Sequence, residues 1–193
     1  NIIVTGVFGE ESKHILIPIL KAIEHVNKKN KLSYEFKLKI YGVIKIDMIQ
    51  SNWYNEYIKL YKKLSIENLV QFYGKYNHKK LDTILKDINL AIHIKYKDPC
   101  PNAAIEKLQY GIPHIYSNSG GTPELVGKSG LPINVKDDWY SMKAVDYKIL
   151  SKKIIEIFKN YKTFRKKSYE QGKKFQLSKY IFIHKKIFKN LNK

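Results

Sequence analysis

The chain has 193 residues, of which 44% are hydrophobic, and its formal net charge is +19. This length is typical of one domain, and the apolar content can supply a core, which excludes a disordered chain. No run of about 18 apolar residues is present, so the sequence predicts no transmembrane helix.

The predicted secondary structure alternates between strands and helices. A continuous apolar run over 1–8 is typical of a buried strand, and helical spacing follows over 13–29, with Pro18 placing the start of that helix near itself. A second strand is predicted over 35–41, and the ambiguous segment 43–51 is interpreted as an insertion loop. Further helices are predicted at 53–64, 78–86, 102–110, 147–158, 164–171 and 178–191, and further strands at 69–73, 90–94, 113–116 and 130–135.

Strands that alternate with helices form βαβ units and a parallel sheet. The predicted fold class is therefore α/β, a Rossmann-like doubly wound sheet of five or six strands with extra C-terminal helices. We expect 1–174 to form this domain and 175–193 to form a separate C-terminal helix. Ligands of such sheets bind at the carboxyl ends of the strands, near the point where the strand order reverses.

Cysteine and histidine usage bears on the compartment and on cofactors. Cys100 is the single cysteine, so an internal disulfide is impossible, and this usage is typical of a cytoplasmic protein. The six histidines show no metal-ligand spacing, so we predict no metal site and no cofactor. The sequence has neither a starting Met nor a signal peptide and begins at Asn1 in a strand, which we interpret as a piece of a longer chain.

The positive charge is carried almost entirely by lysine, because Arg165 is the sole arginine. Lysine, isoleucine, asparagine and tyrosine are abundant together, which is typical of a compositional bias. The alternative interpretation is an anionic partner, either nucleic acid or the inner face of an anionic membrane. Arginine binds phosphates and base edges with two parallel hydrogen bonds, which lysine cannot do. Because the charge is carried by lysine, nucleic acid is the less favoured of these partners.

The most informative stretch spans 98–124, after one predicted strand and around the next. Asn102 is predicted to cap the following helix, and the free N–H groups at this helix start form an anion site for a diphosphate. Asp98 precedes the helix and Glu106 lies about one turn into it. Both carboxylates can accept hydrogen bonds from sugar hydroxyls, as a nucleotide sugar requires. Alternatively, Asp98 only fixes its loop and Glu106 only offsets the helix dipole.

The order of motifs in this stretch resembles the donor-binding signature of the family-four glycosyltransferases of the GT-B fold. Seven residues separate Asp98 from Glu106, Gly111-Ile112-Pro113 follows the helix, and Gly120-Gly121-Thr122-Pro123-Glu124 follows the next strand. The resemblance covers nearly the whole chain. It implies the C-terminal, donor-binding half of such an enzyme, with 175–193 crossing back to an N-terminal acceptor-binding domain that this sequence does not contain.

The resemblance also implies roles for individual residues. Glu106 would bind the ribose hydroxyls, and Asp98 would contact hydroxyls of the transferred sugar and so act with Glu106 as the catalytic pair. Asp98 is one methylene shorter than the Glu usual in the family, which bears on reach and sugar preference. The further donor contacts that it implies are Lys13, Gly74, Lys75, Cys100, Pro101, Asn102 and Ala103, and the implied loop-bracing residues are Gly120, Gly121 and Glu124.

The first strand–helix turn departs from the family pattern. The family often carries a basic residue directly after the first strand, whereas this turn contains Glu10 and Glu11 and supplies a cation only at Lys13. A lost cation weakens stabilisation of the leaving group. The turn therefore leaves open a catalytically inactive, glycosyltransferase-like subunit.

We accordingly predict a metal-independent glycosyltransferase of the hexosyltransferase type, which transfers sugar from a nucleoside-diphosphate sugar to a hydroxyl acceptor in saccharide or glycoconjugate biosynthesis. The alternatives are a sugar-nucleotide epimerase or phosphorylase of the same fold and a basic polyanion-binding module. Two other motifs are interpreted as structural: Asp137-Asp138 as a turn rather than a metal site, and the tyrosine-rich segment 53–61 as a half-buried helix face rather than a base-stacking surface.

Overall fold

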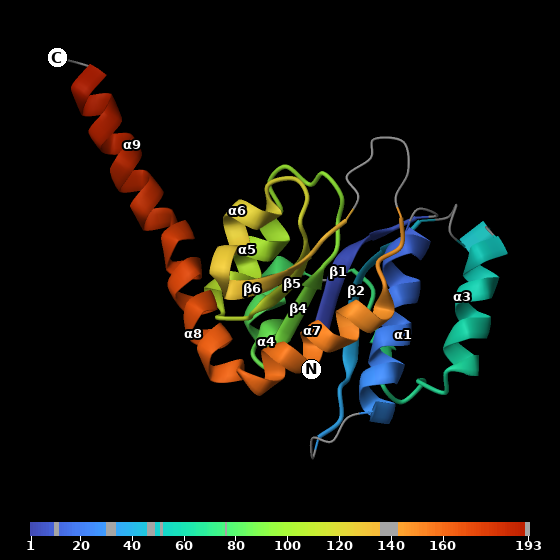
Figure 1. Cartoon of the computed structure of the whole chain (residues 1–193). Coiled ribbons are helices and arrows are strands. Elements are labelled where there is room, and N and C mark those ends of the chain that lie inside the picture. Colours follow the sequence, from blue (N-terminus) through green and yellow to red (C-terminus); the bar gives the residue numbers. More distant parts are fainter. Residues whose placement is uncertain are drawn as a thin grey trace.

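The computed structural model of the chain describes residues 1–9, 12–29, 34–45, 49–50, 52–75, 77–135 and 143–191. They form a six-stranded parallel sheet with strand order β3-β2-β1-β4-β5-β6 and helices on both faces (Figure 1). The strands are β1 (Ile2–Phe8), β2 (Leu38–Ile44), β3 (Val70–Phe72), β4 (Leu90–His93), β5 (His114–Ser117) and β6 (Gly130–Ile133). This is the order of a doubly wound Rossmann-like sheet, which confirms the predicted fold class.

The helices form two layers around the sheet. The layer on one face consists of α1 (Lys13–Lys29), α3 (Asn52–Lys63) and α7 (Tyr147–Lys159). The layer on the other face consists of α4 (Leu81–Leu85), α5 (Asn102–Gln109) and α6 (Thr122–Val126), with the 3₁₀ turns η2 (His78–Lys80) and η3 (Gly127–Ser129) beside them. The chain continues through α8 (Tyr161–Gly172), which packs on α5, and η4 (Lys173–Phe175) to α9 (Leu177–Leu191).

The apolar run of β1 is explained by burial on both faces of the sheet. Ile2 and Val4 pack with α1 in the larger core cluster, whereas Ile3 packs with Leu85 of α4 on the opposite face. Alternate side chains of a strand point to opposite faces, so a strand covered on both sides is apolar throughout. Thr5 lies on the same face as Ile3, under α5.

The tyrosine-rich segment of α3 is a half-buried helix face. Tyr57 is 8% exposed, and Tyr54, Ile58 and Tyr61 pack against the larger core cluster. The structural interpretation of this segment is therefore confirmed for these side chains. Asp137 and Asp138 lie outside the described residues.

Two local predictions were wrong. Pro18 lies inside α1, which begins at Lys13, because burial of Pro18 and its apolar neighbours against the sheet offsets the missing backbone hydrogen bond. The second strand is shifted from 35–41 to Leu38–Ile44 and runs through Gly42. Glycine is required there because a Cβ on Gly42 would lie 1.9 Å from the carbonyl oxygen of Gly6 on β1. Of the segment interpreted as an insertion loop, Val43 and Ile44 thus belong to β2.

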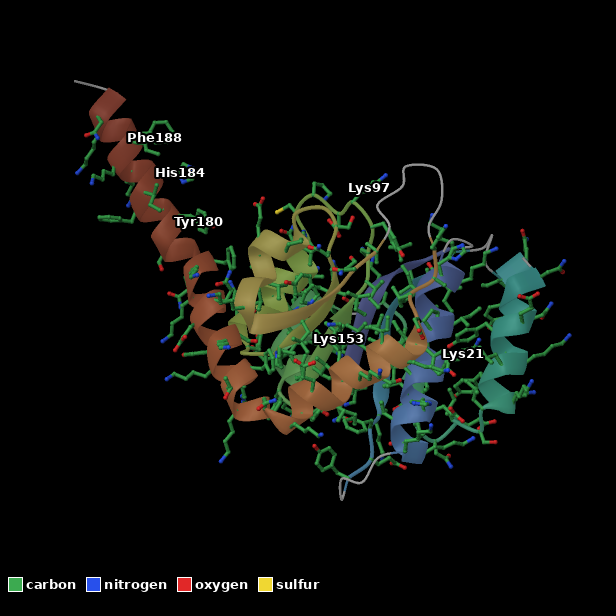
Figure 2. The ribbon with its side chains drawn as sticks, viewed as in Figure 1. Lys21, Lys97, Lys153, Tyr180, His184 and Phe188 are labelled. Carbon is green, nitrogen blue, oxygen red and sulfur yellow. The ribbon has the colours of Figure 1, made fainter. Side chains whose placement is uncertain are left out.

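Helix α9 extends away from the sheet at one end of the molecule (Figure 1). Figure 2 shows Tyr180, His184 and Phe188 along this helix, apart from the rest of the fold. Phe182 and Phe188 are 70% and 63% exposed. Of the helices formed by the described residues, none combines the length and apolar character needed to cross a membrane. The division of the chain at 174 stays a prediction.

Candidate functional site

The strand order reverses between β1 and β4, which are neighbours in the sheet although β2 and β3 lie between them in sequence. In a doubly wound sheet this reversal leaves a crevice at the carboxyl ends of the two strands. A cavity of about 250 Å³ lies at this edge. It is lined by residues from the first, second and fourth strands, the loop after β3, η2 and α5: Thr5, Gly6, Val7, Tyr41, Gly42, Val43, Lys75, His78, Lys95 and Ala103.

Two glycines line this cavity, and a third lies next to them. Gly6 and Gly42 are paired across β1 and β2, and both line the cavity; a Cβ on Gly42 would lie 2.5 Å from the ring of Phe8. A Cβ on Gly6 would lie 3.7 Å from the Phe8 ring and 3.8 Å from Lys95 Cε, which is ordinary van der Waals contact. Gly74 does not line the cavity but lies next to it: its carbonyl oxygen accepts a hydrogen bond from the Gly42 N–H at 2.8 Å, and its φ of +70° favours glycine.

The N-terminus of α5 borders the cavity. Pro101, with φ −73°, is the N-cap residue and makes no side-chain cap, so the prediction that Asn102 caps this helix was wrong. Asn102 is instead the first helical residue, because the proline already occupies the cap position. The first intrahelical bond is made by the N–H of Ala104 to the Pro101 carbonyl at 2.8 Å, so the N–H groups of Asn102 and Ala103 precede the hydrogen-bonded part of the helix. Such a helix start attracts anions.

Glu106 and Asp98 each lie beside a residue that lines the cavity. Glu106 Oε1 is 3.3 Å from His78 Nδ1, and the Glu106 side chain is 21% exposed. Asp98 Oδ2 is 3.9 Å from Lys95 Nζ, and its side chain is 20% exposed. Neither carboxylate lines the cavity itself: Glu106 reaches its edge from inside α5 through His78, and Asp98 from the loop before α5 through Lys95.

The loop that carries Asp98 is held by the glycine pair after β5. The Gly121 N–H donates to the Asp98 carbonyl oxygen at 2.9 Å. A Cβ on Gly120 would lie 2.4 Å from that oxygen, and one on Gly121 would lie 2.1 Å from the carbonyl oxygen of Pro99. Only glycine permits this close approach, so Gly120 and Gly121 set the position of Asp98. Glu124, on the short helix α6, is exposed.

The remaining residues that the sequence singled out lie in different places. Lys75 lines the cavity. Lys13 is the first residue of α1 and is half-buried, but it does not line the cavity. Cys100 is exposed with a free thiol on the loop before α5.

Sequence analysis missed a buried lysine on α5. Lys107 is 3% exposed, and its Nζ donates to Thr5 Oγ1 at 3.0 Å and to the Ala103 carbonyl at 2.8 Å. Burial lowers its pKa to about 8; the Glu106 carboxylate opposes this shift and Lys95 adds to it. The available signal was its place between Ala104 and Leu108 on the buried face of the predicted helix.

Two buried histidines of β4 and β5 surround this lysine. Burial, together with the positive charges of Lys107 and Lys95, lowers the pKa of His93 to about 3. Burial likewise holds the pKa of His114 well below its ordinary value. The 3.7 Å between His93 Nε2 and Asp98 Oδ2 exceeds a hydrogen bond, and a neutral ring forms no ion pair there. At neutral pH, Lys107 therefore carries a charge next to two neutral rings.

A larger cavity, of about 380 Å³, lies between α1 and α7 and is lined by residues such as His25, Lys29 and Lys152. It contains none of the residues around Asp98 and Glu106. The smaller cavity, in contrast, lies at the strand reversal and next to a helix start. Within the part of the chain that the structure describes, no three His, Cys, Asp or Glu side chains are grouped so that they could hold a metal ion.

The family model of the glycosyl transferases group 1 matches residues 3–175, which include every element that builds the cavity. The chain belongs to this family. A search of the curated proteins found no match.

Solved structures of glycosyltransferases and of a sucrose-phosphate synthase share the fold of this chain. Sucrose-phosphate synthase (tll1590) from Thermosynechococcus elongatus is similar over 98% of this chain and 45% of its own, with a TM-score of 0.72 and 18% identity. The pneumococcal O-GlcNAc transferase GtfA, in complex with UDP and GlcNAc, is similar over 98% of this chain and 35% of its own, with a TM-score of 0.73 and 17% identity. Anabaena Alr3699/HepE, in complex with UDP and glucose, is similar over 100% of this chain and 48% of its own, with a TM-score of 0.72 and 16% identity. The chain thus spans at most about half the length of these structures, and identities this low show the fold alone.

Proposed function

We propose that this chain is the donor-binding domain of a glycosyltransferase and binds a nucleoside-diphosphate sugar in the cavity at the strand reversal. The observation that carries the proposal is that the start of α5 borders the cavity while Glu106 and Asp98 lie beside two of its lining residues, His78 and Lys95. The ribose and the transferred sugar need acceptors for their hydroxyl groups, which Glu106 and Asp98 can supply. The diphosphate needs hydrogen-bond donors, which the start of α5 can supply. UDP is the first nucleotide to test, because two of the similar structures hold it.

In the proposed reaction, the bond between the sugar C1 and the diphosphate oxygen breaks, and an acceptor hydroxyl forms the new bond to C1 and loses its proton. The leaving diphosphate takes up the electron pair. Free N–H groups of Asn102 and Ala103 and the ammonium groups of Lys75 and Lys95 are placed to stabilise it, so the proposal requires no metal.

In this proposal the two carboxylates bind different parts of the donor. Glu106 accepts hydrogen bonds from the ribose, which fixes the nucleotide, and Asp98 accepts from the transferred sugar, which orients C1. His78, which now lies 3.3 Å from Glu106, is exposed and can move aside. The membership in family four and a partner domain that supplies the acceptor site and the general base are part of this proposal. So is a cytoplasmic location.

Calorimetric titration of the 193-residue chain with UDP, GDP and ADP, at low and high salt, tests the donor site. We expect saturable binding of one nucleotide, weakened about 10- to 100-fold by Glu106→Ala, since hydrogen bonds to a charged group contribute about 1.5–3 kcal/mol. Glu170→Ala is the matched control, because it makes the same charge change on the exposed side of α8. Equal, salt-sensitive binding of all three nucleotides that ignores Glu106→Ala would identify a general polyanion surface instead.

A further inference from the structure

Lys107 is an ammonium group buried beneath the cavity. It spans from α5 to β1, where Thr5 both accepts its hydrogen bond and lines the cavity. Its two acceptors, Thr5 Oγ1 and the Ala103 carbonyl oxygen, are uncharged. Both acceptor residues line the cavity, so the lysine sits directly behind its wall.

The direction of this hydrogen bond fixes what Thr5 can do. An ammonium group donates and cannot accept, so Thr5 Oγ1 is the acceptor. The hydroxyl proton of Thr5 is then left to donate to another group. Within the described part of the chain, this hydroxyl donates to no other residue, and the side chain borders the cavity. A ligand oxygen in the cavity would complete its hydrogen bonding.

Stability alone does not account for a lysine at this place. A buried charge with neutral partners costs desolvation free energy, and an apolar side chain of similar size is often equal or better for stability. Ala104 and Leu108, which flank it on the buried face of α5, are both apolar. A residue that violates local packing rules without a stability gain points to a functional site.

We propose that Lys107 is a positioning residue of the nucleotide site, which holds the Thr5 hydroxyl as a donor to a ligand oxygen and places a positive charge behind the bound diphosphate. This inference rests on the proposed nucleotide binding and extends it to residues outside the carboxylate pair. It also supplies a cation that the first strand–helix turn does not place in the cavity, because Lys13 does not line it. Low dielectric behind the wall strengthens the attraction between this ammonium and an anion.

The test compares UDP with uridine, which lacks the charged diphosphate, in calorimetric titrations of the wild-type chain and its variants. In Lys107→Met we expect UDP binding to weaken about tenfold, and at least about threefold more than uridine binding, because only UDP loses the charge attraction. Thr5→Val should weaken UDP binding about fivefold, whereas Thr5→Ser, which keeps the hydroxyl, should bind like the wild type. The double variant Thr5→Val/Lys107→Met should bind UDP no more than about twofold more weakly than Lys107→Met, because both changes remove the same hydrogen bond.

A structural role for Lys107 gives a different result. If the lysine only ties α5 to β1, Lys107→Met would weaken UDP and uridine equally or leave both unchanged, and either outcome overturns the inference. Circular dichroism melting shows whether each variant folds. If Lys107→Met does not fold, the comparison of Thr5→Val with Thr5→Ser replaces it as the test. Equal UDP binding by these two variants overturns the inference. A wild-type chain that binds no nucleotide overturns the proposed function itself. Wild-type binding with unaffected variants overturns only the role of Lys107 and Thr5.

Discussion

Replacing Lys107 by methionine should change how stability depends on pH. The pKa of Lys107 is lowered from 10.5 to about 8 in the folded chain, mainly by burial. The unfolded chain therefore holds this proton more tightly than the folded chain. The resulting penalty is fully present below a pH of about 8 and declines as the pH rises toward 10.5. The gap between the two pKa values corresponds to about 3 kcal/mol of free energy of unfolding.

Urea unfolding followed by circular dichroism measures this effect at pH 7 and pH 9.5. Over this interval the wild-type chain should gain about 2 kcal/mol in free energy of unfolding relative to Lys107→Met. The buried tyrosines, such as Tyr57, whose pKa burial raises to about 12, also change stability in alkali, but they are common to both proteins and cancel. A stability difference that stays constant between the two pH values would refute the assignment of Lys107 as a buried cation with a lowered pKa.

Three further predictions concern the surroundings of the cavity. Burial lowers the pKa of His93 to about 3, so the folded chain resists its protonation, and the wild type should lose about 2 kcal/mol of free energy of unfolding between pH 7 and pH 5 that His93→Gln retains, measured by urea unfolding. Gly121→Ala, whose Cβ would lie 2.1 Å from the Pro99 carbonyl oxygen, should cost about 2 kcal/mol in stability. Gly6→Ala, whose Cβ would meet its nearest neighbour at 3.7 Å, should melt at the wild-type temperature, and equal melting of the two variants would contradict the close approach of the loops. Asp98→Ala should leave UDP binding within about twofold but weaken binding of UDP-glucose about fivefold or more, and a uniform loss for both ligands in calorimetry would argue against a contact to the sugar.

The alternation of strands and helices was enough to predict the sheet, because the period of the apolar residues changes between strand and helix. The local motifs were also visible: Gly120 and Gly121 are needed where two loops touch, and Asp98 and Glu106 flank a helix start. These features depend on residues close together in sequence. Asp98 and Glu106 lie near one cavity because the carboxyl ends of parallel strands meet at one edge of the sheet.

The features that were missed depend on contacts between distant residues. Lys107 and Thr5 are 102 positions apart, and nothing local indicates that β1 lies beside β4 and under α5. Gly42 is needed for the approach of β2 to β1, which sequence alone does not reveal. Asn102 has the preference of a capping residue, but Pro101, with its fixed φ, takes that position first.

A crystal structure of the chain with UDP tests the central claim most directly. The account predicts that the nucleotide lies over Gly6 and Gly42, with its ribose at Glu106 and its diphosphate at the start of α5. Nucleotide bound instead in the cavity between α1 and α7, or no nucleotide contact with Glu106, would contradict it.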